Sequence, residues 1–555
     1  MPTRRSFLHG AAATLVGAAA NPTFQAAGGL DQTNAKAMIV ATTGPAAIEH
    51  GLNAMRDGGS AADAVLTTAL SQIALCAGCW VSYAGRMTAV YFDAETGKLH
   101  ALNACYDAPR AEKNPMSIPR SPTPSGRNVL VPGFMAGLEA LHSKFGKRPF
   151  SNLFQPSIKL AEDGFTLTNN LAGLIQRKQT VLTRYQGGRE VFQNKNGTLY
   201  KAGDHFRQPQ LAATLSKVAQ YGAKFMYEGD WSKKFVETVR AENGRISLVD
   251  LKQYSPTWSE PLHTVLANGI SVHGLPTPNR GGPLALACLN LANHAGISEL
   301  GHYTQSIESL ERILKIETAM RIMNFRRGKT ALAKKLGREV LLNDCAESEF
   351  GKQLWNMIQS NAWKELLDEL RQPEKRSEHS DAVVAVDPFG NMAAILHTIN
   401  TAGWGTTGMF VDGVSIPDSG ANQQSAIAEA GPGGRIADYG PPLIAMKNGR
   451  PVLAGSATGS GNVNASWQNF ADVLLYGQTP QEAADTPNFY NLTFERNALE
   501  TDFFQKAVDQ GVPVRLKDRF GGFELGFWAG IGADPGNNEL QSGKIRKLDG
   551  VTMQF

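Results

Sequence analysis

The chain has 555 residues, of which 42% are hydrophobic and 19% charged, and its formal net charge is +4. This length allows two or three average domains or one large α/β unit, and the composition excludes a globally disordered chain. The nearly balanced charge, with no basic run beyond isolated Lys-Arg pairs, argues against nucleic acid as a partner.

The first residues have the features of an export signal. Arg4 and Arg5 precede an Ala-rich, weakly apolar stretch of roughly a dozen residues, which is too short to span a bilayer of about 30 Å as a helix. We expect a Tat-type signal peptide over residues 1–27, cut near Ala20 or Ala27, and a mature periplasmic protein. A chance Arg-Arg pair in a tail is the alternative. No later stretch has about 18 uninterrupted apolar residues, so no integral membrane segment is expected.

The chain up to residue 376 predicts a mixture of helices and strands. Residues 46–75 have helical periodicity and many small side chains, with a break at residues 58–59. Strands are predicted over residues 83–91 and 99–103, which flank a turn. Residues 326–376 are rich in Lys, Arg and Glu and poor in β-branched residues, which is typical of helices that end in a solvated linker.

The five cysteines do not indicate a disulfide framework, because their number is odd and they are scattered. Cys76 and Cys79 have the spacing of half a zinc site or of a redox motif, but no second pair completes a metal site. The favoured interpretation is two small buried residues. No metal and no cofactor is expected.

We expect the chemistry just after the charged linker. Residues 382–386 are uninterruptedly apolar, which is typical of a strand buried on both faces, and a turn at residues 387–391 leads to a second apolar run over residues 392–398. Ser380 stands at the start of this hairpin. A hydroxyl there suits an enzyme that cuts its own chain, because cleavage frees an α-amine of pKa about 7.7 to 8.0 beside the hydroxyl. An ordinary β-meander is the alternative.

The hairpin resembles the start of the small subunit of the γ-glutamyltransferases, a family of N-terminal-nucleophile hydrolases. The shared pattern is a hydroxyl residue, an Asp seven positions later, Gly-Asn, and a strand that ends in Thr-x-Asn-Thr. Counting back from Asp387 gives Ser380 as the nucleophile and His379–Ser380 as the scissile bond, whereas Ser377 misses the register by three. Other segments that resemble the family lie at residues 131–138, 155–165, 208–215 and 276–282.

The resemblance implies an α/β fold, a four-layer αββα sandwich formed jointly by two subunits cut from one precursor. Residues 28–379 would form the large subunit, and residues 380–555 would form the small subunit with the N-terminal nucleophile. The two would stay together as a heterodimer, which could assemble further. The substrate would be a small-molecule amide or a peptide.

The resemblance also assigns roles to residues in the C-terminal part. Thr398 would support the amino group of Ser380, and Asn400 would help to hold the substrate. Gly459 and Ser460, in a Gly-rich loop over residues 453–462, would donate backbone N–H groups to the tetrahedral intermediate, where one lost donor costs about 3 kcal/mol. The alternatives are ordinary capping of a strand end and a plain helix N-terminal turn.

Part of the family's γ-glutamyl pocket is missing. Cys105 stands where an arginine would clamp the substrate carboxylate, and a thiol cannot form that bidentate pair. Ala421 replaces the aspartate that binds the substrate amino group, which leaves Asp418 and Asn422 as polar candidates in that segment.

Two further segments depart from the family pattern. Asp438 and Tyr439, after Arg435, replace a Ser-Ser pair, and the segment that ends at Arg86 replaces a Gly-rich loop. Because charge-assisted hydrogen bonds contribute roughly 1.5 to 3 kcal/mol each, these losses remove much of the glutamate recognition. We therefore expect a different acyl group, and a carboxylate engaged by Arg86 or Arg435 is one possibility.

The expected mechanism has two stages. In the precursor, Ser380 Oγ attacks the carbonyl of His379, and water resolves the resulting ester. In the mature enzyme, the Ser380 α-amine accepts the Oγ proton while the hydroxyl attacks a substrate amide, and water or an amine resolves the acyl-enzyme. The alternatives are a true γ-glutamyltransferase or glutathione hydrolase with a rebuilt pocket, and an uncleaved periplasmic binding or scaffold protein.

Overall fold

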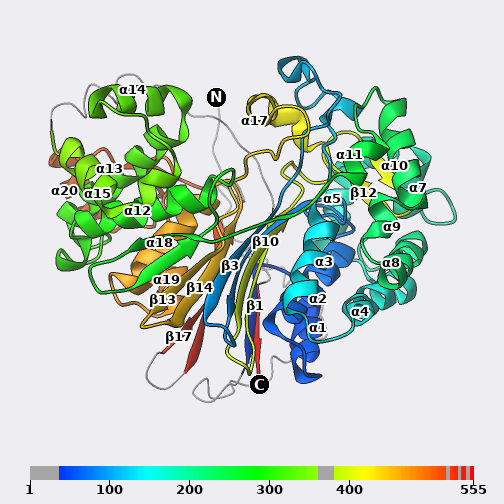
Figure 1. The fold of residues 1–555 in the computed structure, drawn as a ribbon, viewed down its shortest axis with the longest axis horizontal. Coiled ribbons are helices and arrows are strands. Elements are labelled where there is room, and N and C mark those ends of the chain that lie inside the picture. Colours follow the sequence, from blue (N-terminus) through cyan, green and yellow to red (C-terminus); the bar gives the residue numbers. More distant parts are fainter. Residues whose placement is uncertain (1–36, 361–379, 521–524, 535–538, 545–549) are drawn as a thin grey trace, which may run out of the picture.

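The computed structural model describes residues 37–360, 380–520, 525–534, 539–544 and 550–555. Two antiparallel sheets lie face to face at the centre, and a layer of helices covers the outer side of each (Figure 1). The predicted α/β fold, a four-layer αββα sandwich, is confirmed. Within these ranges, no helix has both the length and the apolar character needed to cross a membrane.

The first sheet contains the predicted hairpin at its centre. Its seven strands are, in spatial order, β19 (Val551–Gln554), β1 (Met38–Ala41), β9 (Ser380–Val386), β10 (Met392–Thr398), β2 (Arg86–Asp93), β3 (Lys98–Ala104) and β6 (Thr257–Ser259). Three of its strand pairs, β19–β1, β1–β9 and β10–β2, join a strand from before residue 380 to one from after it, so the two parts of the chain build this sheet together.

The second sheet packs its strand β14 against β9 and β10. Its six strands are, in spatial order, β18 (Leu540–Lys544), β17 (Phe527–Ala533), β14 (Arg450–Thr458), β13 (Leu443–Lys447), β8 (Ser271–Gly274) and β7 (Leu262–Val265). It also draws strands from both sides of residue 380.

The helices divide between the two outer faces (Figure 1). On the side of the first sheet lie α1 (Pro45–Arg56), α2 (Ala61–Leu75), α3 (Phe134–Phe145), α4 (Phe150–Asp163), α5 (Asn169–Arg177), α6 (Gln179–Leu182), α7 (Gln186–Phe192), α8 (Pro209–Tyr221), α9 (Lys224–Tyr227), α10 (Asp230–Ala241) and α11 (Leu248–Lys252), with the short strands β4 (Phe165–Thr166), β5 (His205–Phe206), β11 (Met409–Val411) and β12 (Val414–Ile416). On the side of the second sheet lie α12 (Gly281–His294), α13 (Ile307–Asn324), α14 (Arg326–Leu336), α15 (Ser348–Ile358), α18 (Asn462–Leu474), α19 (Pro480–Asp485) and α20 (Thr501–Asp509), with β15 (Thr493–Glu495) and β16 (Arg515–Lys517). The helix α17 (Gln424–Ala430) packs against a 3₁₀ turn at residues 115–117.

The predicted break in the first helical region is confirmed. The helix α1 ends at Arg56, and Ser60 caps α2 by accepting a hydrogen bond from the backbone N–H of Asp63, whose carboxylate accepts from the N–H of Ser60. A Cβ on Gly51 would come within 2.1 Å of Thr68 Oγ1. The small residues of this region therefore let α1 and α2 approach closely.

The Gly-rich segment at residues 453–462 is mostly strand, so the prediction of a loop from residue 453 was wrong. The strand β14 continues to Thr458, and α18 starts at Asn462. A Cβ on Gly455 would lie 2.5 Å from Trp528 Nε1 and 2.9 Å from a ring carbon of Phe470. Small residues are needed here because aromatic rings pack on a central strand, not because the chain turns.

The layer between the sheets changes from apolar to polar along its length. Val384 and Val386 on β9 pack with Ala454 and other apolar residues of the second sheet. Side chains alternate between the faces of a strand, so Ser380 points into the same layer, whereas Asp381 points toward the helices. The buried strand thus directs the predicted nucleophile into the space between the sheets.

Candidate active site

The predicted nucleophile lies in a row of three side chains across the first sheet. Ser380 is 4% exposed and stands directly opposite Thr398 on β10, which stands opposite Arg86 on β2. Directly opposed residues of antiparallel strands share a face, so all three side chains point into the layer between the sheets. The structure therefore brings Ser380 and Thr398 together.

Asn400 is fixed beside this row by its backbone and by its side chain. Its backbone N–H donates to Thr398 Oγ1 at 3.0 Å, and its φ of 56° lies in the left-handed region, which asparagine tolerates better than most residues. Its Oδ1 accepts from Arg86 Nη2 at 3.1 Å, and its Nδ2 donates to Asp438 Oδ2 at 3.3 Å. A substrate group that met Asn400 would find its amide already oriented.

Arg86, on the first sheet, and Asp438, in the segment that leads into β13, form a buried ion pair. Their closest atoms are 2.5 Å apart, and the side chains are 1% and 2% exposed. Asp438 Oδ1 also accepts from the N–H of Gly440 at 2.7 Å. Burial, and then the Asp438 carboxylate, raise the pKa of the adjacent Cys105 thiol above its ordinary value. Cys105, which the resemblance places at the family's carboxylate clamp, is therefore a neutral thiol beside a carboxylate.

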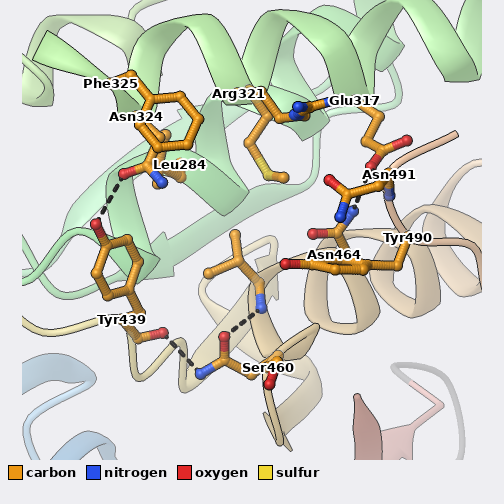
Figure 2. Close-up of a pocket in the computed structure, with 13 residues that line it drawn as sticks. Leu284, Glu317, Arg321, Asn324, Phe325, Tyr439, Ser460, Asn464, Tyr490 and Asn491 are labelled. Carbon is orange, nitrogen blue, oxygen red and sulfur yellow. Dashed lines mark hydrogen bonds between the residues drawn. The ribbon is translucent and has the colours of Figure 1, made fainter. Parts of the chain in front are cut away.

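The loop of Gly459 and Ser460 approaches the same group. Gly459 has φ of 86°, a conformation that favours glycine, at the end of β14. In the first turn of α18, Asn462 Nδ2 donates to the backbone oxygen of Tyr439 at 3.1 Å (Figure 2). Because Tyr439 follows Asp438 directly, this bond ties the loop to the ion pair.

Two predicted substrate-binding residues have other surroundings. Asp418 Oδ2 accepts from the backbone N–H and the hydroxyl of Thr406, at 2.8 and 2.5 Å, so this carboxylate anchors a turn. Asn422 is exposed at the end of a 3₁₀ turn. Neither belongs to the group around Ser380 and Asn400.

Arg86 and Arg435, the two candidates for engaging a substrate carboxylate, each form an ion pair with a carboxylate of the protein itself. Arg435 donates to Asp107 at 2.5 Å and to the backbone oxygens of Asn103 and Ser255 at 2.6 and 2.7 Å. The charge of Arg86 is balanced by Asp438. Both guanidinium groups are therefore engaged with carboxylates of the protein itself.

Sequence reasoning missed Asp381, which anchors the start of β9. Its carboxylate accepts from Thr43 Oγ1 at 2.6 Å, Trp80 Nε1 at 2.9 Å and Thr42 Oγ1 at 3.3 Å. Burial raises the pKa of Asp381 to about 6, against these hydrogen bonds, which lower it. The only signal in the sequence was a charged residue next to an apolar run. By accepting these hydrogen bonds, Asp381 fixes the backbone that carries Ser380.

Several buried polar atoms at this end of the layer have no partner in the described part of the chain. They are Arg86 Nε and Nη1, Thr88 Oγ1, Ser456 Oγ and Thr458 Oγ1. Native structures leave few such atoms unsatisfied, and those that remain call for an explanation, such as a functional role. They mark the polar end of the layer as the candidate active site.

Comparisons with known proteins identify the family to which the chain belongs. The family model described as gamma-glutamyltranspeptidase matches residues 47–521. The chain belongs to the γ-glutamyltranspeptidase family. It is therefore an enzyme of the N-terminal-nucleophile hydrolase type.

Relatives of this γ-glutamyltranspeptidase family member span most of its length. It is 27% identical over 513 residues to the glutathione hydrolase proenzyme of Bacillus subtilis (strain 168), with 86% of this chain and 84% of that protein covered. It is 24% identical over 539 residues to the glutathione hydrolase proenzyme of Escherichia coli (strain K12), with 88% and 87% covered. The crystal structure of cephalosporin acylase from Bacillus halodurans has a TM-score of 0.76 at 20% identity, over 94% of this chain and 96% of that chain, which shows a shared fold.

The buried ion pair predicts a strong dependence of stability on both partners. Arg86→Gln or Asp438→Asn alone should lower the free energy of unfolding by about 3–5 kcal/mol, because each leaves an unpaired buried charge. The double variant Arg86→Met/Asp438→Leu should lose clearly less than the sum. Urea denaturation in a common Ser380→Ala background measures these differences.

The exposed pair of Lys234 and Asp412 supplies the control for that comparison. Lys234→Met should change the free energy of unfolding by less than about 1 kcal/mol, as is usual for surface pairs. Equal, small effects of Arg86→Gln and Lys234→Met would contradict the structural importance of the buried pair.

Proposed function

We propose that this protein is an autoprocessing amidohydrolase or acyltransferase that cleaves an amide bond through an acyl-enzyme on Ser380. The observation that carries the proposal is the place of Ser380. It is the buried first residue of a central strand, directly opposite Thr398, at the polar end of the layer between the sheets. The glutathione hydrolases of Bacillus subtilis and Escherichia coli are named as proenzymes, which supports the cleavage.

The first stage would occur in the precursor. Ser380 Oγ attacks the carbonyl carbon of residue 379, the peptide bond shifts to an ester, and water releases a carboxylate on His379 and an α-amine on Ser380. His379 lies outside the described residues. Support for this bond comes from Ser380 itself, because Asp381 and its three donors fix the chain immediately after it.

The second stage would use the new terminus. The Ser380 α-amine, directly or through one water, accepts the Oγ proton while the oxygen attacks the substrate carbonyl. Thr398 would support the amine, and the backbone N–H groups of Gly459 and Ser460 would donate to the oxyanion. The amine of the substrate leaves with a proton, and water or a second amine then attacks the ester. Asn400 would hold the substrate with its oriented amide.

We further propose that the acyl group is not a standard γ-glutamyl group. Recognition of an α-amino acid end needs a free cation and a free anion, and near Asn400 the protein pairs Arg86 with Asp438. Cys105 supplies no charge there. The alternative, a true γ-glutamyltransferase or glutathione hydrolase, draws on the names of the relatives, which are glutathione hydrolases.

The proposal extends to export and assembly. Residues 1–27, which lie outside the described ranges, would act as a Tat-type signal that sends the protein to the periplasm. Residues 28–379 and 380–555 would then be the two subunits. Both sheets combine strands from the two sides of residue 380, so the subunits would remain together after cleavage.

Purified protein should run as two bands on denaturing electrophoresis, because the bond before Ser380 is cut. N-terminal sequencing of the smaller band should begin at Ser380. Ser380→Ala should remain one chain, whereas the matched control Ser377→Ala should be processed. A single full-length band of the unaltered protein would favour the uncleaved binding or scaffold alternative.

The processed enzyme should be a poor γ-glutamyl hydrolase. For γ-glutamyl-p-nitroanilide, we expect kcat/KM at least about 100-fold below that of the best substrate in a panel of N-acyl p-nitroanilides, since two charge-assisted contacts are lost. Release of p-nitroaniline measures both rates in one preparation. Comparable turnover of the γ-glutamyl compound would restore the glutathione hydrolase alternative.

A further inference from the structure

A pocket adjoins the loop of Gly459 and Ser460 on the side of the second sheet. Its wall is formed by α13, by the first turn of α18 and by residues 490–491, with Ser460 and Tyr439 at one edge (Figure 2). The space inside it that is accessible to a water-sized sphere is about 70 Å³, so the pocket has room for a small polar group such as a carboxylate rather than for a whole substrate. Ser380 is not among the lining residues, so the pocket is an extension of the candidate active site rather than its centre.

One side of α13 supplies the polar wall. Glu317, Arg321 and Asn324 are spaced at i, i+4 and i+7, which places them on one face of the helix (Figure 2). Asn324 Oδ1 accepts from the hydroxyl of Tyr439 at 2.9 Å. The residue after Asp438 is thereby linked to the helix that carries Arg321.

Arg321 is the single cation among the thirteen lining residues, all of which lie in the described ranges. Its guanidinium group has no hydrogen-bond or ion-pair partner in the part of the chain that the structure describes. It is only half-buried, so a ligand in the pocket can reach it. In this respect it differs from Arg86 and Arg435, whose charges are balanced by carboxylates.

Among the described residues, Glu317 lies on the same helix face as Arg321 but forms no ion pair with it. Its Oε2 accepts from the backbone N–H of Leu492 at 2.7 Å, and its Oε1 accepts from the N–H of Asn491 at 2.5 Å and from Asn464 Nδ2 at 3.4 Å. Burial raises the pKa of Glu317 to about 7, against these hydrogen bonds and the charge of Arg321, which lower it. The oxygens of Glu317 are thus held by three N–H donors from residues 464, 491 and 492, and Arg321 is not one of these donors.

We propose that this pocket receives a carboxylate at the far end of the substrate's acyl chain and that Arg321 binds it. The acyl side is favoured because Ser460, at the edge of the pocket, would donate to the acyl carbonyl oxygen. A guanidinium group suits this ligand, since it can donate two parallel hydrogen bonds to one carboxylate. The inference rests on the proposed function and names its substrate class.

Binding of simple acids tests the inference without any turnover. The probes are the straight-chain diacids of four to six carbons, each compared with the monoacid of the same length, in titration calorimetry on the purified full-length protein. One carboxylate of each probe stands for the acyl carbonyl, so the pair differs only in the distal carboxylate. At least one diacid should bind about tenfold or more tightly than its monoacid.

Substitutions test whether the preference for the diacid depends on Arg321. Arg321→Gln should remove the preference for the diacid and leave binding of the monoacid within about twofold, and Arg321→Lys should keep part of the preference. The control is Arg327→Gln, which removes the same charge from an exposed position that does not line the pocket. This control should behave like the unaltered protein.

The outcomes separate the inference from the proposed function. Equal binding of diacid and monoacid, or a preference that survives Arg321→Gln, overturns the carboxylate pocket even if the protein is cleaved at Ser380 and hydrolyses amides. A preference that depends on Arg321 in a protein that stays one uncleaved chain supports the pocket and overturns the enzyme mechanism.

Discussion

The buried ion pair between Arg86 and Asp438 is the interaction on which the candidate site depends. It joins the first sheet to the segment that leads into the second, at the point where the layer between the sheets becomes polar. Both partners contact Asn400, whose backbone in turn contacts Thr398, the residue opposite Ser380. Because breaking a buried pair leaves an uncompensated charge, the arrangement of these groups is held in one geometry.

The same pair constrains what the enzyme can bind. Arg86 and Asp438, two residues that the sequence analysis expected to depart from the family pattern, form an ion pair with each other. Charges that could have contacted an amino acid substrate are engaged within the protein. Specificity then has to come from a neighbouring surface, and the wall of α13 offers the free cation Arg321 close to the loop of Ser460.

Much of the fold followed from local patterns. The apolar hairpin after residue 380, the break before α2 and the position of Ser380 at a strand start are set by alternation and turn residues, which a single sequence reveals. The pairing of Arg86 with Asp438 is not local, so neither residue signals it alone. The glycine-rich segment at residues 453–462 was predicted as a loop because a single sequence does not show that Gly455 packs against Trp528, which is distant along the chain. The sequence did not single out Arg321, because it is one of many charged residues on predicted helices and most such side chains are solvated.

The central claim is that the hydroxyl of Ser380 carries the acyl group. Protein mixed with an activated p-nitrophenyl ester, quenched in acid, digested and analysed by mass spectrometry tests it most directly. The account predicts an added acyl mass on the peptide that begins at Ser380, attached as an ester that hydroxylamine removes. An adduct on another residue, an adduct on the α-amine alone, or no adduct during turnover would contradict it.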